Sequence, residues 1–462
     1  MKATLKILNK PLKTLVVSAL LFSGAAALSQ PTYAQADTSN IVYASQSVTA
    51  SEYKQYLEDN YQIKLSDSLT KGEFVNAISQ ILGLNAQEVE KNQLVDLTEA
   101  SPYYKSANAL FANGILAEST FNGDQQLSQL NAAIIAVNAS DFKELSFTYP
   151  EAKVVAALSK LGLKAEFFSV PAAQTLAVAV DTGIIPASSY LSFKPAAPIS
   201  SDEASALLIK VLDIHGNYKH YIGYVQDNNI YSKVYESYRT QDIIKADDLR
   251  NIFDTALKQD IITGYNLKDN RYTPNFDSKL TLSYGHSDIT HALQLIGLLK
   301  SEGINAKVQL EPKTSAFIYL KEWGEPAISD DYQVVQIENG NFIAYSKEYD
   351  ISFEFDTVKH KEAFDAIISK YAKKNDEDQS GLIKASWWQP LYSSINELPN
   401  YKQITNNKIS RGNYFAQSYT LTQDSADVVA GLKKIDPKAE VTSYNFWVDL
   451  PFYSYLSGED YK

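Results

Sequence analysis

Two segments in the N-terminal half of the chain repeat one order of elements: an amphipathic helix, a glycine turn, a loop and a second apolar helix. One copy spans residues 94–137 and the other spans residues 172–212, while residues 69–84 match only the end of a copy. Gly114 and Gly183 stand where the first helix of each complete copy must end in a left-handed conformation. This repetition restricts the N-terminal half to a helical architecture built from similar units.

Hydroxyl side chains mark the start of the second helix in each copy. At an N-cap, a side-chain oxygen accepts a hydrogen bond from the backbone of the first helical turn. The expected N-cap residues are Thr70, Ser128, and Ser200 or Ser201. Glu73, three residues after Thr70, completes a capping box. The caps therefore predict where three helices begin.

This order of elements resembles the S-layer homology (SLH) domain, which anchors proteins of Gram-positive bacteria to the cell wall. The resemblance covers roughly residues 48–212 and implies three repeats in a pseudo-threefold helical prism whose grooves bind anionic wall polysaccharide. The matching residues are Leu69-Thr70-Lys71-Gly72-Glu73, Val95-Asp96, Gly114-Ile115-Leu116, Gly183-Ile184-Ile185 and Phe193-Lys194-Pro195.

The resemblance also implies a ligand-binding role for Thr70, Lys71 and Glu73, because a fixed cation pairs with an acidic sugar. Lys71 is basic, whereas the equivalent positions near Gln129 and Ser201 are neutral. Two interpretations stay open. The helical domain binds wall polymer through at least one repeat, or it keeps the prism without its ligand sites.

The N-terminus has the pattern of a secretory signal peptide. Four lysines and no acid precede an apolar run from Leu15 to about Leu28, and small residues follow that permit cleavage after Ala34 or Ala36. A secreted protein of the cell wall or cell surface is therefore expected. No later segment has the length and apolar character of a membrane span, so none is expected after signal removal.

Composition excludes several classes of function. The formal net charge is −12, and removal of the four signal lysines makes it −16, so repulsion from phosphate groups argues against a nucleic-acid partner. The chain has no cysteine, which excludes disulfides, thiol catalysis and cysteine-ligated zinc. No cofactor is expected.

A stretch at residues 284–308 places His286, Asp288 and His291 beside an apolar helix. These three are weak catalytic candidates. Offsets of two, three and five residues do not place all three side chains on one helix face, so the interpretation is a capping Asp288 with two histidines, and no metal site.

The same stretch is similar to the core helix of transglutaminase-like, papain-related domains. Its ending, Leu298-Leu299-Lys300 followed by Gly303-Ile304, matches that family's helix end. Where the family has its nucleophilic cysteine, this chain has Ser287 or Asp288, neither of which has the reactivity of a thiolate. The resemblance therefore implies a noncatalytic descendant.

The C-terminal part changes to an alternation of period two, which predicts an α+β domain with an antiparallel sheet. Asn339-Gly340 is a hairpin signal within it. Trp387, Trp388 and Trp447 are weak candidates for an aromatic platform that binds sugar or peptide, with core packing as the alternative.

The expected fold is multidomain: an all-α, SLH-like N-terminal half and an α+β C-terminal domain. The parts are a signal peptide (1–34), a degenerate SLH-like domain (45–215), a helical middle region with a further SLH-like fragment (216–300) and the α+β domain (301–462).

The sequence favours a secreted, noncatalytic surface protein that associates with cell-wall polysaccharide or a peptidoglycan-linked polymer. The alternatives are an enzyme or pseudo-enzyme on a transglutaminase-like core, and a wall-active hydrolase with paired carboxylates. The glycan and the oligomeric state stay open.

Overall fold

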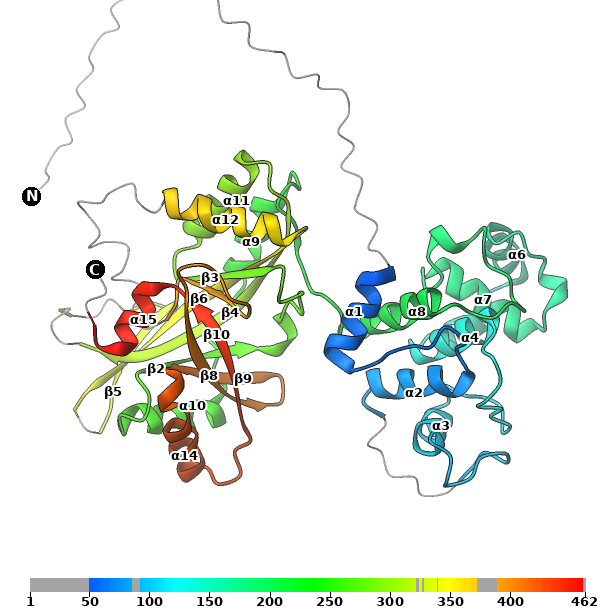
Figure 1. Cartoon of the computed structure of the whole chain (residues 1–462), viewed down its shortest axis with the longest axis horizontal. Coiled ribbons are helices and arrows are strands. Elements are labelled where there is room, and N and C mark those ends of the chain that lie inside the picture. Colours follow the sequence, from blue (N-terminus) through cyan, green and yellow to red (C-terminus); the bar gives the residue numbers. More distant parts are fainter. Residues whose placement is uncertain are drawn as a thin grey trace, which may run out of the picture. The chain divides into compact units, whose positions relative to one another are not determined.

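The computed structural model describes residues 50–84, 92–320, 324–325, 328–338, 340–371 and 389–459, with the backbone alone for 369–371. The predicted signal peptide lies outside these residues and stays a prediction. Helices make up the N-terminal half of the described chain, and strands with flanking helices make up the remainder (Figure 1).

Three central helices form the middle of the helical domain, and each packs against the other two and against one outer helix. The central helices are α2 (Lys71–Ile81), α4 (Gln129–Ala139) and α8 (Ser201–Ile214), and their outer partners are α3 (Tyr104–Ala112), α7 (Val170–Asp181) and α1 (Ala50–Tyr61). Each outer helix packs on the central helix of a neighbouring copy, so the six helices close into a ring of three pairs. Two additional helices, α5 (Lys143–Phe147) and α6 (Glu151–Lys160), and two 3₁₀ turns, η2 (Ala165–Phe167) and η3 (Ala187–Ser189), complete this domain.

The three central helices begin next to one another. The hydroxyls of Thr70, Ser128 and Ser200 each accept a hydrogen bond from the backbone N–H three residues later, as their N-cap positions predict. The backbone also joins successive caps, because Leu127 N–H donates to the Leu69 carbonyl at 3.0 Å and Ile199 N–H donates to the Leu127 carbonyl at 2.9 Å. The caps therefore fix the register of the three copies.

Helix α1 is the outer helix of the copy that contains α2. The sequence showed only the end of this copy, residues 69–84. It ends at Tyr61, and Gln62 then adopts a positive φ of 55°. Gly114 and Gly183 have φ of 70° at the ends of α3 and α7. Gln62 thus takes the position that glycine has in the other copies, at the cost of some backbone strain, and the glycine signal is absent there.

Eight antiparallel strands close into a barrel in the C-terminal half. Their order is β4-β2-β9-β8-β10-β7-β3-β6, and β6 pairs with β4 along 14 residues to complete the ring. The strands are β2 (Gly264–Asp269), β3 (Thr281–His286), β4 (Ala306–Tyr319), β6 (Phe342–Phe355), β7 (Tyr392–Ser394), β8 (Lys402–Arg411), β9 (Tyr414–Thr420) and β10 (Val441–Val448). Two short strands lie at its edges: β1 (Gly223–Tyr224) on β4, and β5 (Tyr332–Gln336) on β6.

The expected α+β domain with a simple antiparallel sheet is therefore wrong. The sheet closes because β4 and β6 are long enough to pair along both of their edges. The barrel also takes β2 and β3 from residues 264–286, a segment expected to be helical. Closure depends on pairing between distant strands, which no local pattern of side chains specifies.

One half of the barrel follows the β-α-β-β-α-β order of ferredoxin-like units. It consists of β3, α11 (Ile289–Ser301), β4, β6, α12 (Val358–Tyr371) and β7, in the spatial order β7-β3-β6-β4. The other half has the order β10-β8-β9-β2 and two helices, α10 (Asp247–Lys258) and α14 (Ser425–Ile435). Two four-stranded sheets thus meet at β4–β2 and β7–β10 to form the barrel.

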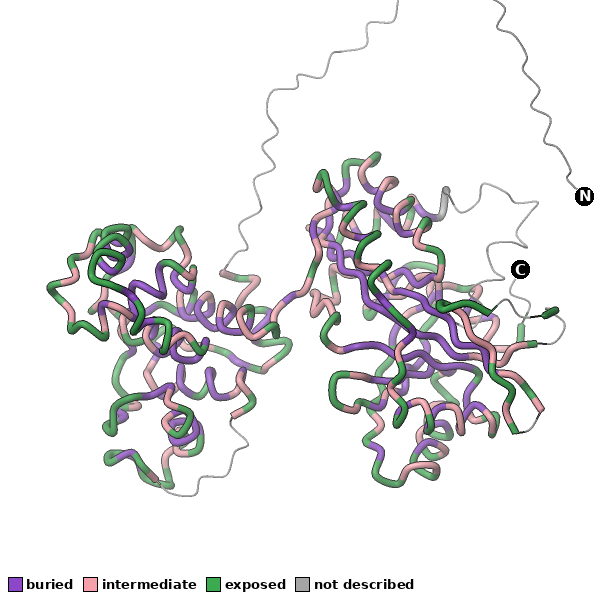
Figure 2. The backbone as a smooth tube through the Cα atoms, turned by 180° about the vertical axis from the view of Figure 1, so that it is seen from behind, coloured by how far each residue is buried: buried purple, intermediate pink, exposed green. Residues whose placement is uncertain are grey.

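Most apolar side chains of the barrel face outward, toward helices. On β4, Val308 and Leu310 belong to a core with α9 (Ile230–Arg239), α11 and α12, whereas Ala316 belongs to a second core with α10 and α14. These two groups of helices lie on different sides of the barrel (Figure 1). Figure 2 shows that most of the strand backbone is buried.

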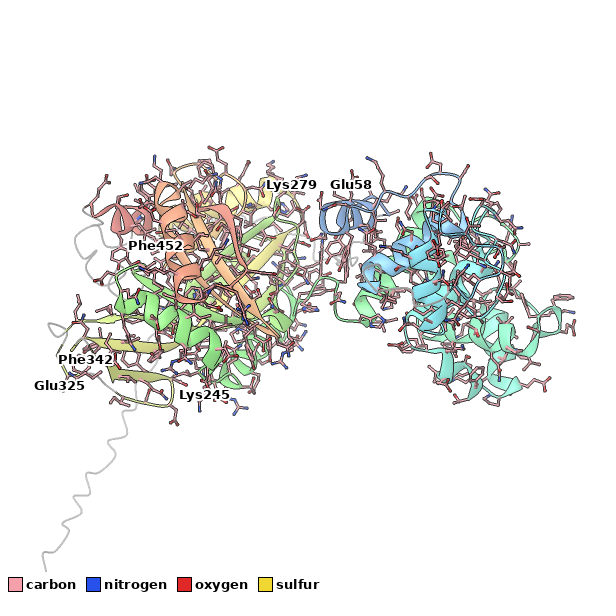
Figure 3. All side chains as sticks on the ribbon, turned by 90° about the horizontal axis from the view of Figure 1, so that it is seen from below. Glu58, Lys245, Lys279, Glu325, Phe342 and Phe452 are labelled. Atoms are coloured by element: carbon pink, nitrogen blue, oxygen red, sulfur yellow. The ribbon has the colours of Figure 1, made fainter. Side chains whose placement is uncertain are left out.

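Helix α15 (Leu450–Ser457) covers one end of the barrel. Its Phe452 packs with Ile404, Phe446 and Val448 of the adjoining strands (Figure 3). The remaining 3₁₀ turns are η4 (Asn270–Tyr272) and η6 (Thr422–Asp424). The polar positions of the strands, which alternate with the outward-facing apolar ones, face the interior of the barrel, here called the lumen.

Candidate functional site

Lys71 is the first residue of α2 and lies near a loop of the next copy. Its Nζ is 5.8 Å from the centroid of the Phe121 ring. The Asp96 carboxylate accepts hydrogen bonds from the backbone N–H groups of Phe121 and Asn122, both at 2.7 Å. The Phe121 bond is the main cause of a lowered pKa at Asp96. Asp96 therefore fixes the loop that carries Phe121.

The Lys71 ammonium has no ion-pair partner in the described part of the chain. Partial burial lowers its pKa, while the nearby Glu118 and Asp96 raise it. Thr70 and Glu73 form the reciprocal hydrogen bonds of a capping box, with the Thr70 N–H donating to Glu73 at 2.7 Å. Their side chains thus position the helix start that presents Lys71.

The two equivalent helix starts are occupied by the domain's own contacts. Gln129 is buried; it donates to Glu203 at 3.1 Å and accepts from the Lys194 N–H at 2.7 Å. Ser201 is also buried. Of the three positions, the one with Lys71 is the one equipped to pair with an external anion.

His286, Asp288 and His291 come together at the start of α11, on the outer face of the barrel. The His286 and His291 rings stack with centroids 4.3 Å apart, and the Asp288 N–H donates to His286 Nδ1 at 2.9 Å. Asp288 is the N-cap of α11, since its carboxylate accepts from the Thr290 N–H at 2.9 Å. Burial, with the neighbouring His291, lowers the pKa of His286 to about 4, so this ring is neutral at pH 7.

These contacts give the His286 cluster a structural role. The Tyr349 hydroxyl donates to the Asp288 carbonyl at 2.9 Å, and the Tyr238 hydroxyl donates to the Ser287 carbonyl at 2.9 Å. The turn before α11 is thus held from both sides. In the described part of the chain, no group of three or more histidine, aspartate and glutamate side chains is arranged to hold a metal ion.

The predicted aromatic platform falls largely outside the described residues. Trp387 and Trp388 lie outside them. Trp447 lies on β10, where it pairs with Ser394 of β7 and Gln403 of β8. Its neighbours Phe446 and Val448 face the end of the lumen that α15 covers. Because successive strand residues alternate, Trp447 points away from the lumen.

The lumen contains a cavity of about 290 Å³. All eight barrel strands contribute to its wall, and the loop between β2 and β3 borders it through residues 273–278. The strand residues that line it are Lys268, Thr281, Ser283, Glu311, Asp350, Ser352, Ser393, Ser394, Asn406, Lys408, Phe415, Gln417, Tyr419, Tyr444 and Phe446. Polar side chains predominate in this lining, together with aromatic rings such as Phe415 and Phe446.

A chain of buried charges crosses the lumen. Lys268 pairs with Glu311 at 3.0 Å and with Asp350 at 2.7 Å, and Lys313 pairs with Asp350 at 2.5 Å. Lys313 also lies 3.8 Å from Glu348. Burial raises the pKa of Asp350, but the two lysines outweigh it and lower that pKa to about 2. Asp350 is therefore ionised at any ordinary pH.

Glu348 is a buried carboxyl whose pKa lies close to neutral pH. Burial raises its pKa to about 7, even though Lys313, Ser315 and Gln389 favour the ionised form. The Ser315 hydroxyl donates to Glu348 at 2.7 Å, and the Gln389 amide also donates to it.

Glu311 and Asp350 are the two carboxylates that line the cavity, on directly opposed positions of β4 and β6. A hydrolase of the paired-carboxylate type needs one acid held protonated beside its substrate. Lys268 pairs with both groups and favours their ionised forms. Burial outweighs this effect at Glu311 and raises the pKa of that carboxyl, whereas the pKa of Asp350 is lowered.

The lumen residues were not candidates from the sequence. Polar residues alternate with apolar ones from Lys307 to Ser315, which is the pattern of a strand with one solvated face. A local signal does distinguish them: charged residues of both signs repeat at these positions in β4 and in β6, where they are paired across the strands.

No family model matches this chain, and no curated protein matches it. Among the residues that the structure describes, no helix combines the length and the apolar character that crossing a membrane requires.

Proposed function

We propose that this is a secreted, noncatalytic cell-surface protein whose helical domain associates with an anionic cell-wall polysaccharide or peptidoglycan-linked polymer. The observation that supports the proposal most is Lys71, a cation without an ion-pair partner among the described residues, placed at a capped helix start beside Phe121. An ammonium group and a neighbouring aromatic ring suit an acidic sugar, because the charge pairs with the acid and the ring packs on apolar sugar faces.

The pseudo-threefold arrangement of α2, α4 and α8 supports the SLH-like interpretation of the repeats. Gln129 is hydrogen-bonded within the domain and Ser201 is buried, so binding is assigned to the helix start at Lys71. The absence of a second and third cation predicts a weaker association than three equivalent sites would give.

The test is sedimentation of the protein, without its signal peptide, with purified Gram-positive sacculi. Sacculi with and without their secondary polymer are compared. The protein is expected to sediment with the former and to stay largely in solution with the latter. Failure to sediment with either preparation would refute wall association.

Lys71→Gln sharpens the test because it removes the charge and keeps a polar side chain, one atom shorter. We expect binding to weaken by about tenfold or more, the loss of about 1.4 kcal/mol or more that a charged hydrogen bond supplies. The control is Lys105→Gln on the exposed surface of α3, which should bind as the unmodified protein does. Equal binding by both variants would place the site elsewhere.

A further inference from the structure

We propose that the barrel lumen is a binding site for a small, anionic, polyhydroxylated molecule of monosaccharide size, a sugar acid or a sugar phosphate. This site is separate from Lys71 and does not depend on wall association. The proposal rests on the cavity, on one cation within it that forms no ion pair among the described residues, and on buried polar atoms that lack partners.

The cavity has the size of one small ligand. Its volume is about 290 Å³. A water molecule occupies about 30 Å³ in the liquid, so the space holds about ten waters or a ligand with a similar number of heavy atoms. Ligand pockets for larger molecules begin at about this volume.

Lys408 supplies the positive charge. The other charged residues of the cavity wall, Lys268, Glu311 and Asp350, pair with one another. Lys408 instead has its Nζ 3.7 Å from the centroid of the Phe415 ring, and no carboxylate of the described residues forms an ion pair with it. Burial lowers the pKa of Lys408, the nearby Lys268 lowers it further, and Glu311 raises it. An incoming anion beside the ammonium would favour its charged form.

The Asn406 side chain, in the cavity wall, has a buried oxygen that accepts no hydrogen bond from the described residues. This side chain is 1% exposed and lines the cavity. Its amide Nδ2 donates to Gln417 Oε1 at 2.7 Å and to the Tyr444 hydroxyl at 2.8 Å, while its Oδ1 has no hydrogen-bond partner. A buried carbonyl oxygen without a donor costs free energy, and a ligand hydroxyl would satisfy it.

Hydroxyl groups complete the polar wall. The Oγ1 of Thr273, in the loop that borders the cavity, also has no partner. Tyr444 accepts from Asn406, which leaves its own O–H free to donate within the described contacts. Four serines from β3, β6 and β7 line the opposite wall, namely Ser283, Ser352, Ser393 and Ser394. Mixed donors and acceptors of this kind suit a molecule with several hydroxyls, and the single unpaired ammonium suits one negative charge.

The experiment is isothermal titration calorimetry of the protein without its signal peptide. The probes are D-glucuronate, glucose 6-phosphate and D-glucose. We expect one or both anionic sugars to bind, and D-glucose to bind at least about tenfold more weakly, because it lacks the charge that pairs with Lys408. Whether the carboxylate or the phosphate binds more tightly identifies the source of the charge. No binding of either anion at millimolar concentration, or equal binding of D-glucose, overturns the proposal.

Lys408→Met removes the charge and keeps the apolar stem on Phe415. The tighter anionic probe should bind at least about tenfold more weakly to this variant, and unchanged affinity overturns the proposal. Lys402→Met, at an exposed position of the same strand, is the matched control and should bind normally. Should Lys408→Met fail to fold, Tyr444→Phe removes one hydroxyl from the wall and should weaken binding several-fold; unchanged affinity in that variant would equally overturn the proposal.

Discussion

The helical domain and the barrel place their apolar side chains in opposite ways, inside the first and mostly outside the strands of the second. In the helical domain, apolar residues such as Leu176 and Leu208 fill the interior and charged side chains lie outside. In the barrel, apolar residues such as Leu310 and Phe353 face outward under helices, and charged residues such as Asp350 face the interior. The comparison teaches that a buried position in this protein is not equivalent to an apolar one.

The difference follows from how each element exposes its surface. A helix needs one apolar stripe, so its remaining positions can be polar and solvated. A strand in a barrel that is covered by helices is buried on both faces, and its polar face must be satisfied by partners inside the protein. The ion pairs among Lys268, Asp350 and Lys313 meet that requirement.

The largest effect that separates the two regions should come from removing a buried charge. Asp350→Asn leaves Lys268 and Lys313 without their shared partner in the lumen, and we expect the free energy of unfolding to fall by about 3–5 kcal/mol. Asp202→Asn breaks the exposed pair with Lys54 in the helical domain and should cost about 0–1 kcal/mol. Urea unfolding of both variants measures the difference. Similar costs for the two variants would contradict the burial of the Asp350 ion pairs in the lumen.

Truncation of an outward-facing barrel residue should cost as much as truncation in the helical core. Leu310 and Leu176 are both fully buried. Replacement of either by alanine should lower the free energy of unfolding by about 2–5 kcal/mol, since each leaves a cavity under packed helices. The same urea measurement applies. A near-neutral Leu310→Ala would mean that the helices do not seal the outside of the barrel.

A smaller effect, which depends on pH, should come from Glu348. Its folded-state pKa of about 7 lies above the ordinary value of 4.5, so between these pH values the folded protein holds a proton that the unfolded chain has lost. Stability therefore falls as pH rises through this window, by about 1.4 kcal/mol per pH unit from this group. Glu348→Gln should remove this contribution.

The readout for Glu348 is the difference between the variant and the unmodified protein in unfolding free energy, measured at pH 5, 6 and 7. The variant should gain relative stability with each step upward. A constant difference across the range would show that Glu348 does not change its protonation there.

The sequence predicted the helix starts in the N-terminal half because caps and glycine turns are local signals. Thr70, Ser128 and Ser200 are N-caps in the structure, and Gly114 and Gly183 end their helices. The sequence did not predict α1, because Gln62 replaces the expected glycine. It also missed the barrel, because the pairing of β4 with β6 that closes it is a non-local property.

The candidate site residues differ in the same way: local signals predicted some of them, and distant strand pairing brings the others together. Asp288 was expected as a helix cap, and the structure places it there. The lumen site has no compact motif, since Lys268, Asp350 and Lys408 come from three strands far apart in the chain. Their proximity exists only once the barrel has closed.

The most direct test of the account compares Lys71→Gln and Lys408→Met in one sedimentation assay with sacculi. Wall association is proposed for the helical domain, and a separate small-molecule site is proposed for the barrel. Lys408→Met should therefore sediment like the unmodified protein, whereas Lys71→Gln should stay largely in solution. Loss of sedimentation in Lys408→Met, with Lys71→Gln unaffected, would contradict this division of roles.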